Sequence, residues 1–305
     1  ALPISTMIES IPLYTGIPCA VLLLLIAVMP LAAPHFWEKN RNKAIISAIV
    51  GIPILIYLLQ HFSGELLHTM EDYVAFIVLL GSLFIISGGI LMTGDLPATP
   101  RTNTLFLAFG AVLANFIGTT GASMMLIRPI LRTNAERRHT GHIPVFFIFV
   151  VSNIGGCLTP LGDPPLFLGY LNGVPFFWTF SLLPEWLMAI AIVLGIFYII
   201  DVRAYRKERP VDLTYDRLHV EPIRVRGLVN FAFLGGVIIA VALRFPTPWR
   251  ELIMIAMTVL SLVFTSKQTR RDNRFTYGPI IEVAVLFAGI FVTMVPLLMI
   301  LSEKG

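Results

Sequence analysis

The sequence predicts an all-α integral membrane protein with about eight transmembrane spans, one re-entrant hairpin and one broken helix. Of its 305 residues, 56% are hydrophobic and 13% are charged, and the mean hydropathy is +0.83. Soluble domains average about 45–50% apolar and about 25% charged residues, so this composition is typical of a multi-pass membrane protein. A second observation is that apolar runs of membrane-spanning length recur along the chain. A third is that two of these runs are interrupted by glycine, proline and polar residues.

The predicted spans are apolar runs of 15–29 residues, near the roughly 17–25 residues with which a helix crosses the hydrocarbon core. They are Ile17–Pro34, Ala44–Phe62, Tyr73–Met92, Ile143–Leu171, Leu182–Asp201, Leu228–Leu243, Glu251–Thr265 and Tyr277–Leu301. The fourth run is the longest and contains the break. A further apolar stretch, Asn103–Leu131, is long enough to cross once, but "FIGTTGAS" at residues 116–123 interrupts its middle.

The charge of the loops decides how this further stretch is interpreted, because lysine and arginine concentrate in cytoplasmic loops. The loop at 61–72 is acidic, and the loop at 171–185 has no basic residue. The basic loops cover residues 35–43, 128–139, 203–226 and 267–274. With the N-terminus outside, all four lie in the cytoplasm if the stretch enters the membrane and returns, with its tip at Gly118–Gly121. The alternative is one long kinked helix, which would invert every later loop.

The run that contains "TPLGDPP" at residues 159–165 predicts a helix that stops inside the membrane. Its prolines cannot donate backbone hydrogen bonds, and the nearby glycines permit unusual dihedral angles. Backbone groups freed at membrane depth are costly unless protein or a water-filled cavity surrounds them. We therefore expect one half-helix that ends near Cys157 and a second that starts at Pro164. Secondary transporters bind ions and substrates at such breaks.

Asp163 is the only charged residue between His142 and Glu185. A carboxylate near the bilayer centre costs at least about 2.5 kcal/mol, and an ionisable group at this depth suggests a function. The alternative reading is helix capping, since Asp is a good N-cap residue and Pro suits the first helical position. The two roles are compatible with each other.

The predicted binding site combines this break with the tip of the hairpin. The tip supplies hydroxyl and amide oxygens, which are hard donors of the kind that small cations use. The predicted ion- or substrate-binding residues are Asp163, Asn153, Ser152, Thr159, Gly162, Asn115, Thr119, Thr120 and Ser123. Among them, Asp163 is the predicted Na⁺ ligand.

Other functional classes find little support in the sequence. No H-E-x-x-H, G-x-S-x-G or P-loop motif occurs, so we expect no enzyme activity. We also expect no cofactor, apart from transported Na⁺ and H⁺. The net charge of +4 fits cytoplasmic loops and is no argument for nucleic acid. Cys19 and Cys157 both lie in apolar segments and imply neither a disulfide framework nor a metal cluster.

These motifs resemble the ion transporter superfamily, which includes sodium/proton antiporters of the NhaD type, arsenite pumps, and citrate and dicarboxylate carriers. "SNIGGCLTPLGDPPLFLGY" at residues 152–170 is similar to its broken fifth element. The superfamily pattern G-G-x-x-T-P-x-G is matched by Gly155, Gly156, Thr159, Pro160 and Gly162. "ANFIGTTGASMMLI" at 114–127 resembles its hairpin tip. "APHFWEKN" and "EVAVLFAGIFVTMVPLL" resemble a bacterial branch described as sodium/proton antiporter or citrate carrier.

The resemblance implies a fold of two inverted repeats, each with a re-entrant hairpin and a broken helix. On this reading residues 1–202 form the first repeat, with the hairpin at 103–131 and the broken helix at 143–172. Residues 203–226 form a cytoplasmic linker. Residues 227–305 begin an incomplete second repeat, so we expect the chain to be a fragment or its other half to be supplied elsewhere.

The expected function is secondary transport, with sodium (or another cation)/proton antiport preferred. The preference rests on Asp163, because a carboxylate binds Na⁺ and H⁺ in turn. The resemblance implies an aspartate at this position in NhaD-type antiporters and a neutral residue in citrate-like branches. One alternative is citrate or dicarboxylate transport coupled to Na⁺ or H⁺, and another is a non-transporting subunit. The expected location is a bacterial inner membrane, the expected partners are the lipid bilayer and a small cation or carboxylate, and a homodimer is compatible with the sequence.

Overall fold

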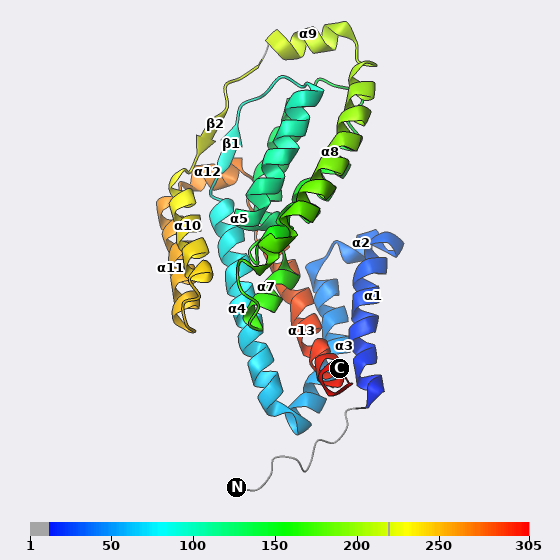
Figure 1. The fold of residues 1–305 in the computed structure, drawn as a ribbon, viewed down its shortest axis with the longest axis vertical. Coiled ribbons are helices and arrows are strands. Elements are labelled where there is room, and N and C mark those ends of the chain that lie inside the picture. Colours follow the sequence, from blue (N-terminus) through cyan, green and yellow to red (C-terminus); the bar gives the residue numbers. More distant parts are fainter. Residues whose placement is uncertain (1–11, 219, 305) are drawn as a thin grey trace. The chain divides into compact units, whose positions relative to one another are not determined.

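The computed structural model describes residues 12–218 and 220–304, most of which are helical (Figure 1). Six of the described helices are long and apolar enough to cross a membrane. The chain folds into two compact units. Unit 1 contains the chain up to Ile77 and again from Thr276, and unit 2 contains Val78–Phe275. The predicted position of the N-terminus outside the cell concerns residues 1–11, which lie outside the described part.

Unit 1 is a small bundle in which the last helix packs between the first ones. A 3₁₀ turn (Leu13–Gly16) leads into α1 (Ile17–Ala32), which is followed by α2 (Pro34–Trp37) and α3 (Asn40–His61). The final helix, α13 (Gly278–Lys304), packs along α3 and α1. Helix α4 (Ser63–Ser87) begins in unit 1 and continues into unit 2.

The prediction of an acidic loop at residues 61–72 is wrong, because only Phe62 separates α3 from α4. The segment is helical because its apolar residues recur one turn apart, which places them on one face. Leu66 is buried in a cluster with Ile54 and Leu58, and Met70 packs against the same cluster. The charged residues of this turn thus belong to a helix, which extends α4 beyond the predicted start at Tyr73.

The predicted basic loop at residues 35–43 is also shorter in the structure, since α3 begins at Asn40. Lys43 is buried inside this helix, and its Nζ lies 2.6 Å from Oε1 of Glu282 on α13. The ammonium group also lies 5.7 Å from the centre of the Trp37 ring. A buried lysine that is paired with a carboxylate is held in one position, so this pair helps to align α3 with α13.

Unit 2 holds the remaining elements. Its helices are α5 (Pro100–Thr133), α6 (His142–Phe147), α7 (Pro164–Leu171), α8 (Leu183–Tyr205), α9 (Pro210–Leu218), α10 (Val229–Ala242), α11 (Trp249–Phe264) and α12 (Lys267–Asp272). Strands β1 (Leu91–Thr93) and β2 (Arg224–Arg226) pair antiparallel, with Leu91 opposite Arg226. α8 packs against α5, and α10 packs against α11 (Figure 1).

Helix α5 reverses direction in its middle. The backbone of Gly118 has φ 77° and ψ 153°, which is not helical and which a residue with a side chain rarely adopts. A straight helix would separate Asn103 and Asn134 by about 46 Å. Instead, Nδ2 of Asn103 donates to Oδ1 of Asn134 at 2.9 Å, and Nδ2 of Asn134 donates back to Oδ1 of Asn103 at 2.8 Å. The two arms of α5 therefore run antiparallel, with the tip at Gly118.

Two helices that the sequence predicted as spans are short. α10 has 14 residues and α11 has 16. Their lengths of about 21 Å and about 24 Å are less than the roughly 30 Å of a hydrocarbon core. The apolar run of α10 ends at a turn in which Arg244 adopts a positive φ of 51°, and Pro246 and Pro248 precede α11. Both helices agree with the predicted runs at 228–243 and 251–265 to within two residues, so the runs themselves are shorter than the thickness of a hydrocarbon core.

Candidate functional site

The chain from His142 to Leu171 is a helix that loses its regular geometry step by step. It starts as α6, widens to a π-helix over Ile148–Asn153, and tightens to a 3₁₀ helix over Ile154–Leu158. Thr159 is extended, and α7 begins at Pro164. Because prolines lack an N–H group, the regular hydrogen-bond ladder cannot continue through this segment. The backbone groups near the break must therefore find other partners.

The tip of α5 supplies the first of these partners. The N–H and the Oγ1 hydroxyl of Thr119 both donate to the carbonyl oxygen of Gly162, at 3.1 Å and 3.0 Å. The break also folds closely on itself, because a Cβ atom added to Gly162 would clash with the carbonyl oxygen of Gly156. Glycine is thus required here by the approach of two backbone segments, and the hairpin tip and the break form one assembly.

Asn115, four residues from Thr119 on the same arm of α5, bonds to the break at two further points. Its Oδ1 accepts a hydrogen bond from the N–H of Leu158 at 2.9 Å. Its carbonyl oxygen accepts one from Oγ1 of Thr159 at 2.5 Å. Both residues are buried, so these bonds satisfy polar groups that would otherwise be costly in an apolar surrounding.

Hydroxyl and indole groups make further hydrogen bonds to the chain at the break. Oγ of Ser123, on the second arm of α5, lies 2.7 Å from Oγ of Ser152. Nε1 of Trp186 on α8 donates to the carbonyl oxygen of Ile154 at 2.8 Å. Oγ1 of Thr179, in the 3₁₀ helix Trp178–Leu182, donates to the carbonyl oxygen of Leu158 at 2.8 Å. Trp186 and Thr179 were not predicted from the sequence, because each resembles an ordinary residue of an interfacial belt.

Asp163 occupies the N-cap position of α7, but its side chain makes no capping hydrogen bond. The reason is that the next two residues, Pro164 and Pro165, have no N–H group to offer. The first available N–H groups, those of Leu166 and Phe167, bond to the backbone carbonyl of Asp163 at 3.1 Å and 3.3 Å. Its half-buried carboxylate is thus left available beside the hairpin tip.

Apart from Asp163, the predicted site residues divide into two groups. The residues that bond across the junction between tip and break are Asn115, Thr119, Ser123, Ser152, Thr159 and Gly162. Thr120 and Asn153 are exposed instead. Since six of the positions act as a scaffold, the groups best placed to meet a ligand are Asp163 and the exposed polar side chains.

A buried polar network at the other ends of the two α5 arms was not predicted from the sequence. Nη2 of Arg137 lies 2.5 Å from Oδ1 of Asp201 on α8, and both side chains are fully buried. The other oxygen of Asp201 accepts a hydrogen bond from Asn103 at 3.0 Å, and Nε2 of His142 lies 2.9 Å from Oδ1. Because Asn103 also bonds to Asn134, this network holds the base of the hairpin against α8.

Glu208 extends the network at the end of α8. Its carboxylate accepts hydrogen bonds from the backbone N–H groups of Arg138 and His139, at 3.0 Å and 2.8 Å. Burial alone would raise the pKa of Glu208, but these two bonds and the His139 side chain together lower it below its usual value. The carboxylate is therefore held in its charged form, and it lies 3.9 Å from Nε of Arg137.

Comparison with known proteins places the chain in a family. The model of one family matches residues 8–305. This is a family of transporters and not of enzymes, which agrees with the expectation of a membrane transporter without enzyme activity. Neither the curated proteins nor the solved structures contain a match. Since the match spans nearly the whole chain, the chain belongs to the family described as "Putative citrate transport".

Proposed function

We propose that this protein carries citrate or a related carboxylate across a membrane, coupled to Na⁺ or H⁺, at the junction of the α5 tip with the break. The observation that carries the coupling to an ion is Asp163, an uncapped carboxylate at a break where the backbone is held by the hairpin tip. The family description supports citrate as the substrate. The family description also favours citrate transport over cation/proton antiport. Asp163 taken alone favours antiport.

The coupling cation would bind at Asp163. A carboxylate is a hard oxygen ligand for a small cation and also accepts a proton, so one group serves either coupling ion. Its oxygens are not used by the N-terminus of α7. The carboxylate is thus free to change its partner during a transport cycle.

The anionic substrate would bind at the start of the second arm of α5. The first N–H groups of a helix have no partners within that helix, and they attract anions. This arm begins after Gly118. Thr119 and Ser123 are already bonded to Gly162 and Ser152, so the exposed hydroxyl of Thr120 is the side-chain donor that would meet the anion. α7 is less suitable, because its first two residues are prolines without N–H groups. A cation on Asp163 would offset the charge of the bound carboxylate.

A second candidate is sodium/proton antiport, which the same carboxylate favours. In that case Na⁺ and H⁺ compete for Asp163, and no organic anion is carried. We infer for both candidates that the tip of α5 is re-entrant and that the membrane is a bacterial inner membrane.

The re-entrant topology predicts which side of the membrane each end of α5 occupies. Arg101 and Arg132 are exposed at the two ends of the antiparallel arms, and Asn172 follows α7. Cysteines introduced at 101 and 132 should both react with a membrane-impermeant thiol reagent from the cytoplasm, and a cysteine at 172 from outside. The unsubstituted chain, with Cys19 and Cys157, gives the background. Reaction of 101 and 132 from opposite sides would contradict the hairpin.

Transport itself is tested in membrane vesicles from cells that express the protein. Labelled citrate should accumulate when a Na⁺ or H⁺ gradient is imposed, and vesicles without the protein give the background. Sodium-dependent dequenching of a pH-sensitive dye, without citrate uptake, would favour antiport instead. If neither signal rises above the background, the transport proposal fails.

A further inference from the structure

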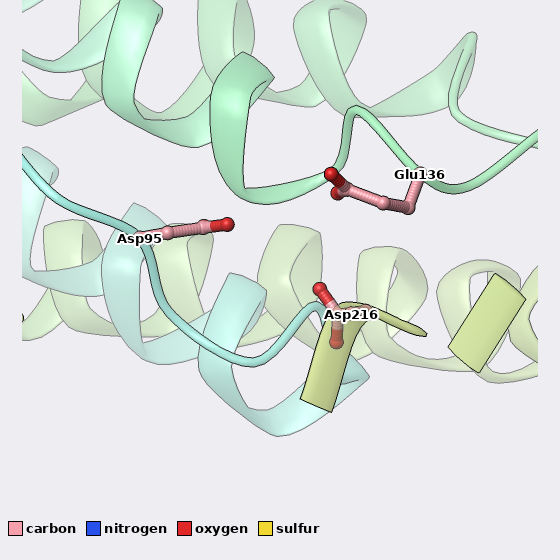
Figure 2. Close-up of side chains that lie close together, drawn as sticks. All are labelled: Asp95, Glu136 and Asp216. Carbon is pink, nitrogen blue, oxygen red and sulfur yellow. The ribbon is translucent and has the colours of Figure 1, made fainter. Parts of the chain in front are cut away.

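Three carboxylates gather beside the two ends of α5 (Figure 2). Asp95 lies between β1 and α5, Glu136 follows α5, and Asp216 belongs to α9. One oxygen atom from each of the three lies within 4.8 Å of the other two. The residues come from separate parts of the chain, so the fold itself brings three negative charges together outside the apolar helices.

Asp216 is buried in a way that its own hydrogen bonds do not explain. The residue is 4% exposed, and its Oδ2 accepts a hydrogen bond from the N–H of Ala98 at 3.0 Å. Its Oδ1 is buried and has no hydrogen-bond partner among the described residues, and the same is true of Oε2 of Glu136. Such oxygens are costly to bury. Figure 2 shows the three carboxylates pointing toward a common space.

Among the described side chains, the nearby arginines form their ion pairs with other carboxylates, although the charge of Arg137 partly offsets that of Asp216. Arg137 pairs with Asp201, and Arg138 and Arg209 both pair with Asp212. Within 12–218 and 220–304, no ion pair joins a described basic side chain to the three carboxylates. Three carboxylates this close together repel one another. A bound cation would relieve this repulsion.

The geometry points to a divalent-cation site formed by Asp95, Glu136 and Asp216, with a preference for Ca²⁺ over Mg²⁺. Ca²⁺ binds oxygen at 2.3–2.6 Å, so two oxygens on opposite sides of it are about 4.6–5.2 Å apart. Mg²⁺ binds at 2.0–2.1 Å, which allows at most about 4.2 Å. The spread of up to 4.8 Å is therefore closer to the span of the larger ion than to that of Mg²⁺.

Ion binding here would fasten α9 to both ends of the hairpin. Asp216 already bonds to Ala98, two residues before α5 begins, and Glu136 lies three residues after α5 ends. The N–H of Asp95 bonds to the carbonyl of Glu221 at 2.9 Å, which ties the cluster to the segment before β2. The site thus stabilises the base of α5, whereas the proposed transport site lies at its tip.

The test is equilibrium binding of Ca²⁺ to the purified full chain in detergent after removal of metals with a chelator. We expect one saturable Ca²⁺ per chain and a clearly weaker affinity for Mg²⁺. Asp216→Asn should weaken Ca²⁺ binding by about tenfold or more, since even the loss of an outer partner of a metal ligand costs about 10–100-fold. Asp95→Asn, in a loop, should weaken it comparably. Asp212→Asn, one turn earlier on α9, is the matched control and should leave it unchanged.

Asp216→Asn preserves an oxygen acceptor for the N–H of Ala98 and removes only the charge. In the presence of chelator its melting temperature should therefore equal or exceed that of the wild type, whereas added Ca²⁺ should raise only the wild-type value. No saturable binding to the wild type up to about 1 mM Ca²⁺, the range of weak protein sites, would overturn the proposal. So would unchanged affinity in both Asp216→Asn and Asp95→Asn.

Discussion

Asp163→Asn should reduce ion-coupled transport by about a hundredfold, which corresponds to about 2.7 kcal/mol of lost cation binding. The carboxylate stands at the break, and its oxygens are not used for capping, so its charge is available to a coupling ion. Asparagine is nearly the same size and cannot bind a proton or balance a cation. The expected result is a protein that inserts and folds normally but no longer uses the ion gradient.

The measurement compares gradient-driven uptake with the amount and melting temperature of the purified variant. Asp163→Glu keeps the charge on a longer side chain and should retain a trace of activity. Glu185→Gln is the matched control, because Glu185 is the next acidic residue along the chain and is exposed in the first turn of α8. Wild-type uptake in Asp163→Asn would remove this residue from the mechanism and leave only its place at the start of α7.

The sequence carried enough information to locate the break, because its cause is local. Prolines and glycines act through the dihedral angles and hydrogen bonds of their own segment, so "TPLGDPP" indicated both the end of one helix and the start of α7. The charge of the loops predicted that the chain returns within 103–131. The structure reverses at Gly118, within the predicted tip, while the depth of this tip in the membrane stays a prediction.

The long-range partners could not be predicted for an equally physical reason. Asn103, Arg137 and Asp201 stand at the ends of apolar runs, where polar residues usually face water or lipid headgroups. Only the folding of α5 against α8 makes them neighbours. The prediction of an acidic loop at 61–72 failed because hydropathy measures how polar a segment is and not whether it is helical. The substrate was ambiguous because a carboxylate at a break serves either an antiporter or a cation-coupled carboxylate carrier.

Removal of one charge from the buried network should give the largest loss of stability. Breaking a buried ion pair by removing one partner costs about 3–5 kcal/mol, because the remaining charge is left in an apolar surrounding. Arg137→Gln should be worse than Asp201→Asn. The first leaves both Asp201 and Glu208 without their arginine, whereas the second leaves Arg137 beside Glu208, 3.9 Å from its carboxylate.

The double variant Arg137→Gln/Asp201→Asn distinguishes a charge pair from simple packing. It removes both charges and keeps side chains that can hydrogen-bond to each other and to Asn103, so it should be less destabilised than the sum of the two single variants. The measurement is unfolding of the purified protein in detergent by heat and by denaturant, for the two single variants and the double. Asp212→Asn, which breaks exposed pairs with Arg138 and Arg209, is the control and should leave the stability unchanged. If the losses in free energy of unfolding simply add in the double variant, the network is held together by packing and not by charge. Equal losses in the two single variants would contradict the role assigned to Glu208.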